Sequence, residues 1–269
     1  MKKYKLTNET IVHFGITLYR IEALMDFSDV KAGDKGGFVQ SEDNLSHKGD
    51  CWVYDNAEVF GNAKVCDYAK VCSNAKVYNN ACVYDNAEVF DNAEVCGNAK
   101  VYDNAEVFDN AEVFGNAVVF GNAVVFGNAK VYDYAKVCSN AKVYNNACVY
   151  DKAEVFGNAK VYDKAEVFGN AKVYNNAVVF GNAVVFGNAK VSGDAKVYKN
   201  SDYIVFKNWW SSGRYFTWTR SNNMWKVGCF YGNGEKLIKK AYADSEESGR
   251  EYERVVRYVE NILADELNK

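Results

Sequence analysis

Residues 111–129 read AEVFGNAVVFGNAVVFGNA, in which one six-residue unit is repeated without interruption. The same period extends far beyond this stretch. Val occupies every sixth position from Val53 to Val197, and Ala occupies every sixth position from Ala57 to Ala195. The consensus unit is Asn-Ala-x-Val-aromatic-Gly/Asp, and position x is mostly Glu or Lys. A short, fixed period over so long a stretch indicates a solenoid, because each unit must stack on its neighbours to bury its apolar side.

The alternation within the unit predicts which side chains face inward. In an extended strand, Ala and Val share one side, and x and the aromatic residue share the other. Burial of unpaired Glu or Lys is strongly unfavourable, so Ala and Val are expected inside. Gly or Asp followed by Asn suits a corner, because Gly and Asn tolerate the left-handed backbone region. Three units and three corners predict a triangular coil of 18 residues. Successive coils should stack about 4.8 Å apart.

An inward aliphatic residue, two turn residues and an inward small residue at period six resemble the hexapeptide repeat of left-handed parallel β-helices. The left-handed sense is implied by this resemblance alone. The whole chain also resembles a family of uncharacterised hexapeptide-repeat proteins of phages, prophages and bacteria. The segments that carry this likeness are LYRIEA at 18–23, GGFV at 36–39, the repeat tract, and WWSSGRYF at 209–216. The family resemblance implies a phage or prophage origin and no particular activity.

The chain is therefore predicted to be a mainly β protein in three parts. These are an N-terminal β cap at 1–38, a left-handed parallel β-helix at 39–200, and a small C-terminal α+β domain at 201–269. The composition changes sharply after the repeat, since four of the five Trp residues fall between 209 and 225. Turn residues and apolar periodicity predict strands near 203–210, 214–220 and 224–231, and helices near 234–244 and from the Ser248-x-x-Glu251 capping box onward.

The histidine content argues against the enzymes that use this kind of repeat. Hexapeptide acyltransferases need a general-base His at a coil edge, usually with an extruded loop, whereas this chain has only His13 and His47 and a tract without insertions. His47 falls on the register of the inward Val in the first coil, where we expect a cap histidine. A carbonic anhydrase of this architecture needs three His ligands for zinc. Residues 51–200 contain no Thr, which argues against an ice-binding surface. The sequence thus predicts no enzyme, no catalytic residue, no cofactor and no metal site. A hexapeptide-type acyltransferase is the less favoured alternative.

Composition and charge limit the compartment in which the protein is expected and the partners that it is expected to bind. The formal net charge of −3 argues against coating duplex DNA. The apolar runs are shorter than the roughly 18 residues of a membrane helix, and Met-Lys-Lys is followed by no apolar leader. Eight cysteines without an export signal are expected as free thiols in a reducing compartment. These features predict a cytoplasmic protein that does not interact with membranes, in the host cytoplasm if it is phage-encoded.

The charge distribution along the repeat predicts self-association. Residues 113–129 carry no charge, residues 85–112 hold eight acids against one Lys, and residues 130–200 hold ten Lys against six acids. An apolar waist between acidic and basic regions favours a lateral homo-oligomer. The predicted interface residues are Val118, Phe120, Val124 and Phe126.

Basic and aromatic residues are interleaved in the C-terminal domain. Because Arg binds phosphate through two parallel hydrogen bonds and rings stack on bases, this cluster predicts a site for a nucleotide-like anion. An alternative interpretation is that the rings form the core of the domain and the Arg side chains pair with the acidic last helix. The predicted ligand-binding residues are Arg214, Tyr215, Trp218, Arg220 and Lys226.

Two functions follow from the sequence. The first is a scaffold or interaction protein whose β-helix presents a C-terminal recognition domain. It would antagonise a host defence factor by binding a host protein or an anionic nucleotide. The second is a structural rod or filament component that assembles with itself, because solenoid ends with unpaired strand edges invite stacking.

Overall fold

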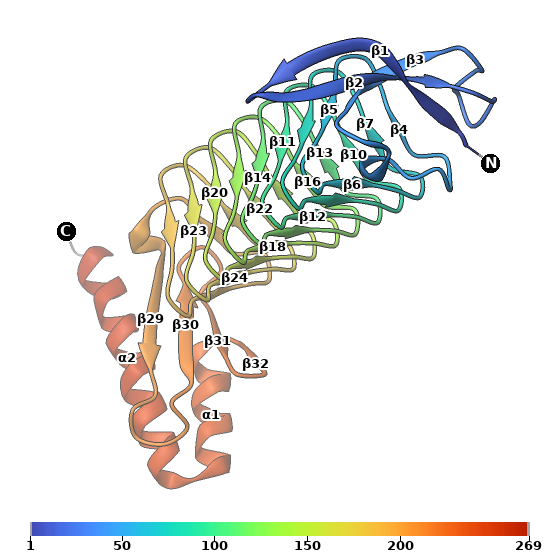
Figure 1. Ribbon diagram of the computed structural model, residues 1–269. Helices are drawn as coiled ribbons and strands as arrows, with labels where there is room; N and C mark the ends of the chain where they lie inside the picture. Colours follow the sequence, from blue (N-terminus) through green and yellow to red (C-terminus); the bar gives the residue numbers. More distant parts are fainter. Residues whose placement is uncertain (1, 268–269) are drawn as a thin grey trace.

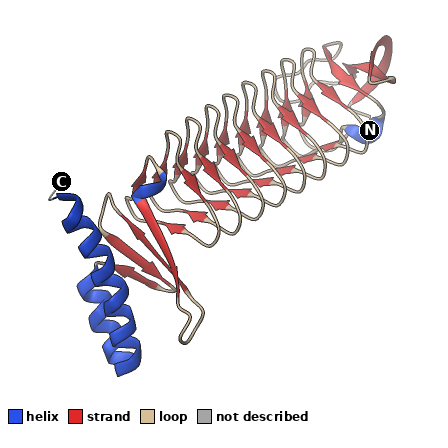
Figure 2. Cartoon of the chain, turned by 90° about the vertical axis from the view of Figure 1, so that its left-hand side faces the viewer, coloured by secondary structure: helices blue, strands red, loops and turns tan. Residues whose placement is uncertain are grey.

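Short parallel strands, stacked in three sheets, form a long rod in the middle of the chain (Figures 1 and 2). The structure is a computed structural model that describes residues 2–267. Paired strands lie 18 positions apart, as in Glu88 opposite Glu106 and Val89 opposite Val107. The longest row of repeat strands contains nine. The predicted β-helix with about 18 residues per coil is therefore confirmed.

Each sheet forms one face of the rod and is named here after its first repeat strand. The β4 face contains β4 (Trp52–Val53), β7 (Lys70–Val71), β10 (Glu88–Val89), β13 (Glu106–Val107), β16 (Val124–Val125), β19 (Lys142–Val143), β22 (Lys160–Val161), β25 (Val178–Val179) and β28 (Lys196–Val197). The β5 face contains β5 (Glu58–Val59), β8 (Lys76–Val77), β11 (Glu94–Val95), β14 (Glu112–Val113), β17 (Lys130–Val131), β20 (Cys148–Val149), β23 (Glu166–Val167) and β26 (Val184–Val185). The β6 face contains β6 (Lys64–Val65), β9 (Cys82–Val83), β12 (Lys100–Val101), β15 (Val118–Val119), β18 (Lys136–Val137), β21 (Glu154–Val155), β24 (Lys172–Val173) and β27 (Lys190–Val191).

The interior of the rod is filled by Ala and Val, as predicted. Every repeat Ala from Ala57 to Ala195 is fully buried, and every repeat Val from Val53 to Val197 is at most 1% exposed. A fully buried Val stabilises a fold by about 1.5–3 kcal/mol relative to an exposed one. Small and branched side chains fill the narrow interior, and the long side chains at position x stay outside.

Each corner needs one residue in the left-handed backbone region. That residue directly follows the aromatic position, as at Gly121 with φ 73° and Asp103 with φ 60°. A Cβ on Gly121 would lie 2.8 Å from the backbone nitrogen of Ser139 in the next coil, which explains the preference for Gly here. The second turn residue, Asn, has a different role. Its side chain joins a ladder between coils, as Asn62 Nδ2 donates to Asn80 Oδ1 at 3.1 Å.

The outward rings stack along the rod. On the β4 face, consecutive ring centroids lie 4.7 Å apart for Phe90 and Phe108 and 5.0 Å apart for Phe108 and Phe126. The planes in these pairs differ by 8° and 9°. Stacking leaves the rings half-buried, although they lie outside the core. Cross-strand pairs of this kind stabilise a sheet by roughly 0.2–1 kcal/mol each.

The N-terminal end of the rod is covered by an antiparallel hairpin. Strands β1 (Tyr4–His13) and β2 (Ile16–Ala23) pair with each other, and β2 pairs with β3 (Lys35–Val39). Strand β3 pairs in parallel with β5 of the rod and is followed along the chain by the short helix η1 (Glu42–Asn44). Backbone bonds run from the N–H of one coil to the C=O of the next, so this end presents carbonyls. Donors from the cap reach these carbonyls: Tyr4 donates its hydroxyl to Leu45 O at 2.8 Å, and Lys3 Nζ donates to Cys51 O at 2.7 Å.

The C-terminal unit is a four-stranded antiparallel sheet with two helices packed on one side (Figure 1). After η2 (Asn200–Asp202), its elements are β29 (Tyr203–Lys207), β30 (Tyr215–Thr219), β31 (Met224–Val227), β32 (Phe230–Gly232), α1 (Gly234–Asp244) and α2 (Glu246–Leu267). The predicted α+β character is confirmed. The last helix begins before the predicted Ser248 box, because Ser245 Oγ accepts from Ser248 N at 3.1 Å. Within the described residues, neither helix has the length and hydropathy required to cross a membrane.

The C-terminal unit also closes the last coil. This end of the rod presents N–H groups, each of which would otherwise bond to a carbonyl of a further coil. Side-chain oxygens take the place of those carbonyls. Val184 N donates to Asn200 Oδ1 at 2.8 Å, Lys190 N to Thr217 Oγ1 at 2.8 Å, and Lys196 N to Ser221 Oγ at 2.6 Å. One edge donor on each of the three faces is thereby satisfied, and the exposed strand edges that invite stacking are covered.

Candidate functional site

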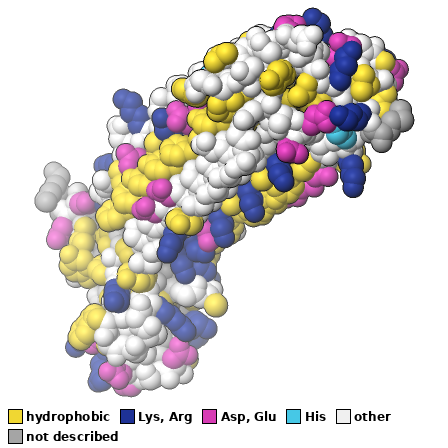
Figure 3. All heavy atoms as spheres, in the orientation of Figure 1, with side chains coloured by type: hydrophobic (Ala, Val, Ile, Leu, Met, Phe, Trp, Pro, Cys, Tyr) yellow, Lys and Arg dark blue, Asp and Glu magenta, His cyan; other side chains and the backbone are white. Residues whose placement is uncertain are grey.

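The β6 face is the basic side of the rod. Position x on this face is Lys in five of its eight strands and Glu in one. Figure 3 shows Lys and Arg side chains gathered where the rod meets the C-terminal unit. Two of the Lys residues, Lys172 and Lys190, stand on the last two strands of this face, directly beside that junction. The end of the β6 face is therefore positively charged where the two parts meet.

A groove lies between the end of the β6 face and the C-terminal sheet. It has a volume of about 460 Å³. Its rod side carries Lys172 and Lys190, and its sheet side carries Arg214, Tyr215 and Gly228. The residues that line this groove include three cations and no carboxylate. We call it the junction groove.

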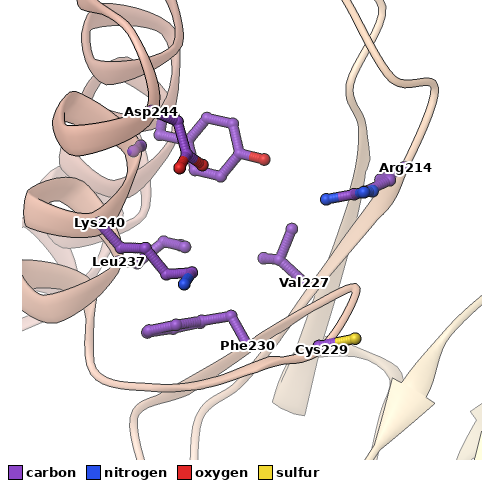
Figure 4. A pocket seen from close by; sticks show the side chains of 9 residues that line it. Arg214, Val227, Cys229, Phe230, Leu237, Lys240 and Asp244 are labelled. Atoms are coloured by element: carbon purple, nitrogen blue, oxygen red, sulfur yellow. The ribbon is translucent and has the colours of Figure 1, made fainter.

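A second cavity of about 300 Å³ lies within the C-terminal unit, between the sheet and α1. Arg214 lines this cavity as well as the junction groove. Figure 4 shows Arg214 on the strand side and Lys240 reaching in from α1, with Val227 between them and Leu237 beside Lys240 on the helix. Asp244 supplies the one carboxylate of the lining, and Cys229 lies at the rim with its sulfur turned outward. We call this the helix-side cavity.

The charges of these two spaces are largely uncompensated. Among the described residues, no acid lies within ion-pair distance of Arg214, Lys190 or Lys240, whereas Lys172 Nζ contacts Glu154 Oε2 at 2.6 Å. Arg214 is exposed, and within the described part of the chain its guanidinium has no hydrogen-bond partner. A guanidinium and two amines around a groove suit a ligand with more than one negative charge.

The structure brings together only part of the predicted ligand-binding set. Arg214 and Tyr215 both line the junction groove, and Lys226 lies 6.0 Å from the ring of Tyr174 on the β6 face. Trp218 is 1% exposed and packs in the core of the C-terminal unit. Arg220 forms an ion pair of 2.6 Å with Glu266 of the last helix. For Trp218 and Arg220, the structure thus follows the alternative interpretation of a domain core and a helix ion pair.

Three basic residues of these sites were not identified from the sequence. Lys172 and Lys190 belong to the repeat, where Lys at position x is common, and Lys240 belongs to a helix with several Lys residues. The spacing of 18 does predict that Lys172 and Lys190 stack on one another. Nothing in the periodicity indicates that the C-terminal sheet packs beside them, since this requires knowledge of how the two parts dock.

Both histidines lie at the N-terminal end, far along the chain from these cavities. His13 Nδ1 is 2.9 Å from Glu58 Oε2, and His47 Nδ1 accepts from Lys3 N at 3.2 Å. The described residues contain no group of three or more His, Cys, Asp or Glu side chains placed to hold a metal ion. Nor do any of the eight Cys residues form a disulfide within the described chain. Burial raises the pKa of Cys66 to about 12 and that of Cys72 to about 11, so both stay protonated near neutral pH.

The four predicted interface residues do not share a surface. Val118 and Phe120 lie on the β6 face, whereas Val124 and Phe126 lie one corner further on the β4 face. All four side chains are half-buried and point outward, as predicted. Since adjacent faces of a triangular rod point in different directions, one flat partner surface contacts either pair but not both.

Comparisons with known proteins bear on the repeat. No family model matches the chain. A segment of 63 residues is 36% identical to the "Uncharacterized acetyltransferase YdcK" of Escherichia coli (strain K12). The match covers 20% of this chain and 19% of that relative, so the chain spans about a fifth of the length of the curated protein it resembles. This likeness agrees with a hexapeptide-repeat solenoid.

The same relative corrects one expectation from the sequence. The shortage of histidines predicted that the protein is not an enzyme, but the relative is named as an acetyltransferase. The exclusion of enzymes was therefore wrong, and the chain is a candidate enzyme. Histidine is only one kind of general base. Carboxylates such as Asp244, which lines the helix-side cavity, also accept protons in enzymes.

Proposed function

We propose that the protein binds a small, multiply charged anion of the nucleotide class in the junction groove and the helix-side cavity. The single observation that supports this most directly is the place of Arg214, an exposed guanidinium that lines both spaces and has no partner in the described chain. Lys190 and Lys240 flank it on opposite sides. Together they would bind separate phosphate groups of one ligand.

The lining also suits the rest of a nucleotide. Tyr215 borders the junction groove, and Phe230 and Tyr252 border the helix-side cavity. Aromatic rings of this kind stack on nucleotide bases without a strong preference for which base is present. The resemblance to phage and prophage proteins suggests a role for this binding. A phage protein that binds a nucleotide signal would lower the amount of that signal available to a host defence factor. The rod would then hold the binding unit at its end.

Arg214→Ala tests this proposal. Hydrogen bonds to charged groups contribute about 1.5–3 kcal/mol, so we expect the variant to bind about 10- to 100-fold more weakly. Titration calorimetry of the full chain with ATP, a cyclic dinucleotide, coenzyme A and inorganic pyrophosphate measures this change. Arg250→Ala is the matched control, because Arg250 is an exposed arginine that lies outside both spaces. Failure of the wild-type chain to bind any of these probes, or equal weakening by both substitutions, would contradict the proposal.

Acyl transfer is a second candidate function, favoured by the acetyltransferase name of the relative. An acyl-coenzyme A carries a nucleotide and a long uncharged arm. The cations would bind its phosphates, and the apolar lining at Val227 and Leu237 would receive the arm. Asp244 lies in the same cavity and would take the proton of an acceptor amine or hydroxyl as that group attacks the thioester carbonyl. Coenzyme A would then leave as the thiol.

Asp244→Asn separates this candidate from binding alone. Incubation with acetyl-coenzyme A and an amine acceptor, followed by chromatography of free coenzyme A, measures turnover. If the protein is an acyltransferase with this base, the variant should bind acetyl-coenzyme A as before and release coenzyme A about 100-fold or more slowly. Binding without release in the wild-type protein would rule out acyl transfer to that acceptor and leave the binding function intact.

A further inference from the structure

The charges on the β4 face follow an order that the other faces lack. Between Lys70 and Val178, position x reads two acids, one uncharged residue and two lysines. This row is Glu88, Glu106, Val124, Lys142 and Lys160. Each residue stands 18 positions, or one coil, from the next. The row therefore reverses its charge about Val124, and its two halves are electrostatically complementary.

Within one chain, this order is unfavourable. Glu88 lies directly opposite Glu106 on one side, although Lys70 faces it on the other, and Lys142 lies directly opposite Lys160. Like charges on neighbouring strands destabilise a sheet. None of these four side chains has an ion-pair partner among the described residues. Some charges on the other two faces are paired within the chain, as Lys130 is with Glu112 at 2.8 Å and Lys172 with Glu154 at 2.6 Å.

We propose that the β4 face is an interface with a second copy of this chain, docked antiparallel about a two-fold axis that runs along β16. Rotation about this axis turns the second rod end for end relative to the first, while the strands on the two β4 faces still run in the same direction. It places Glu88 of one copy against Lys160 of the other and Glu106 against Lys142, and each pair occurs twice. Val124 meets Val124, so no charge is buried at the axis.

The outward rings fit the same axis. The β4 face carries an unbroken stack through Phe90, Phe108, Phe126, Tyr144 and Tyr162, with centroid spacings of 4.7–5.0 Å. Beyond Tyr162 the ladder continues to Phe180 and Tyr198. Among the five rings from Phe90 to Tyr162, Phe126 is in the middle and directly follows strand β16, so the axis maps these five rings onto one another. A second copy would cover the exposed edges of the rings with an identical row. This apolar ladder is also the longest on the rod.

The two caps leave the middle of this face open. The β1–β2 hairpin leans over the β5 face, where His13 contacts Glu58 and the ring of Phe60. The C-terminal unit leans over the end of the β6 face, where Lys226 approaches Tyr174. The described contacts of the caps reach the β4 face only at its ends, at Trp52 and Tyr54 near the first coil and at Lys196 and Tyr198 near the last. A closed dimer through this face also limits growth, unlike end-to-end stacking.

Val124→Asp is the first test, and Val118→Asp is its matched control. Both valines occupy position x in the same coil, both are half-buried, and Glu or Lys occupies this position elsewhere, so both variants should fold. Sedimentation of the wild-type chain at rising concentration should give twice the 30.2 kDa of one chain. We expect Val124→Asp to raise the dimer dissociation constant at least tenfold and Val118→Asp to leave it unchanged.

Charge exchange tests the antiparallel arrangement. The double variant Glu88→Lys with Glu106→Lys places lysines against Lys160 and Lys142 of the other copy, and it should be monomeric. Addition of Lys142→Glu and Lys160→Glu restores opposite charges in every pair, and the fourfold variant should dimerise again. High salt should weaken the wild-type dimer, because exposed ion pairs are screened.

Several results would overturn this inference. A wild-type chain that stays monomeric at every concentration would do so. A dimer that Val118→Asp disrupts as strongly as Val124→Asp would place the contact on another face. A double charge variant that still dimerises, or a fourfold variant that stays monomeric, would contradict the antiparallel pairing of these residues.

Discussion

Val125→Asp should abolish the folded rod, whereas Val124→Asp, one residue earlier in the same strand, should leave it folded. Val125 is completely buried among repeat Val and Ala residues, and a carboxylate there has neither water nor a partner. Burial of an unpaired charge costs far more than the 5–15 kcal/mol by which a typical domain is stable. Val124 points outward between Glu106 and Lys142, so an added carboxylate meets one charge of each sign.

Circular dichroism and thermal unfolding measure this difference. The Val125→Asp chain should lack the β signal of the rod or be insoluble. For Val124→Asp, the free energy of unfolding should change by about 0.5 kcal/mol or less, as for other surface substitutions. The comparison must be made at the same oligomeric state, because Val124 lies at the proposed dimer axis. Equal loss of structure in both variants would mean that the two sides of the strand are wrongly assigned.

Loss of the oxygens that close the last coil should destabilise the chain without abolishing the rod. Thr217→Val with Ser221→Ala removes the acceptors of Lys190 N–H and Lys196 N–H and leaves the shape of Thr217 almost unchanged. The bond to Lys190 N is partly buried, and an unsatisfied buried donor costs about 1–3 kcal/mol. The bond to Lys196 N is exposed, and such a bond contributes about 0.5–1.5 kcal/mol, so the double variant should lose about 1.5–4.5 kcal/mol. The exposed edge should also promote association between rod ends.

Urea unfolding followed by Trp fluorescence reports this change, because four of the five Trp residues lie in the C-terminal unit. Thr219→Val is the matched control. Thr219 is buried on the same strand as Thr217, but its hydroxyl donates to Asn222 and not to the rod. We expect its replacement to cost about 1 kcal/mol. Equal losses in the control and the double variant would show that the contacts to the rod contribute little.

The rod could be predicted from the sequence because one local rule is repeated many times. Ala and Val alternate with residues that carry charge, as in Ala111-Glu112-Val113, and the cost of burying the charge fixes which side faces inward. The coil of 18 residues follows from the same units. The ladder of Asn side chains was missed. The sequence shows Asn at most corners, but the suitability of Asn for turns already explains its presence there.

The candidate site could be predicted only in part, because its two sides belong to different parts of the chain. Arg214 and Tyr215 were identified from their own strand, where charge and aromatic character are local. Lys190 comes close to Arg214 because the C-terminal sheet packs on the rod, and Lys240 does so because α1 packs on that sheet. Arg220 has the same local surroundings as Arg214 but is neutralised by Glu266, which lies 46 residues further along the chain.

The bonding between coils has a consequence for how such a protein changes through evolution. Every interior coil offers the same carbonyls to the coil before it and the same amides to the coil after it, and special chemistry is needed only at the two ends. A gene that gains or loses 18 codons in the tract would therefore give a longer or shorter rod with intact ends, in steps of about 4.8 Å. A change of six codons would instead turn the C-terminal unit onto a different side. Length is thus free to vary in whole turns, whereas orientation is not.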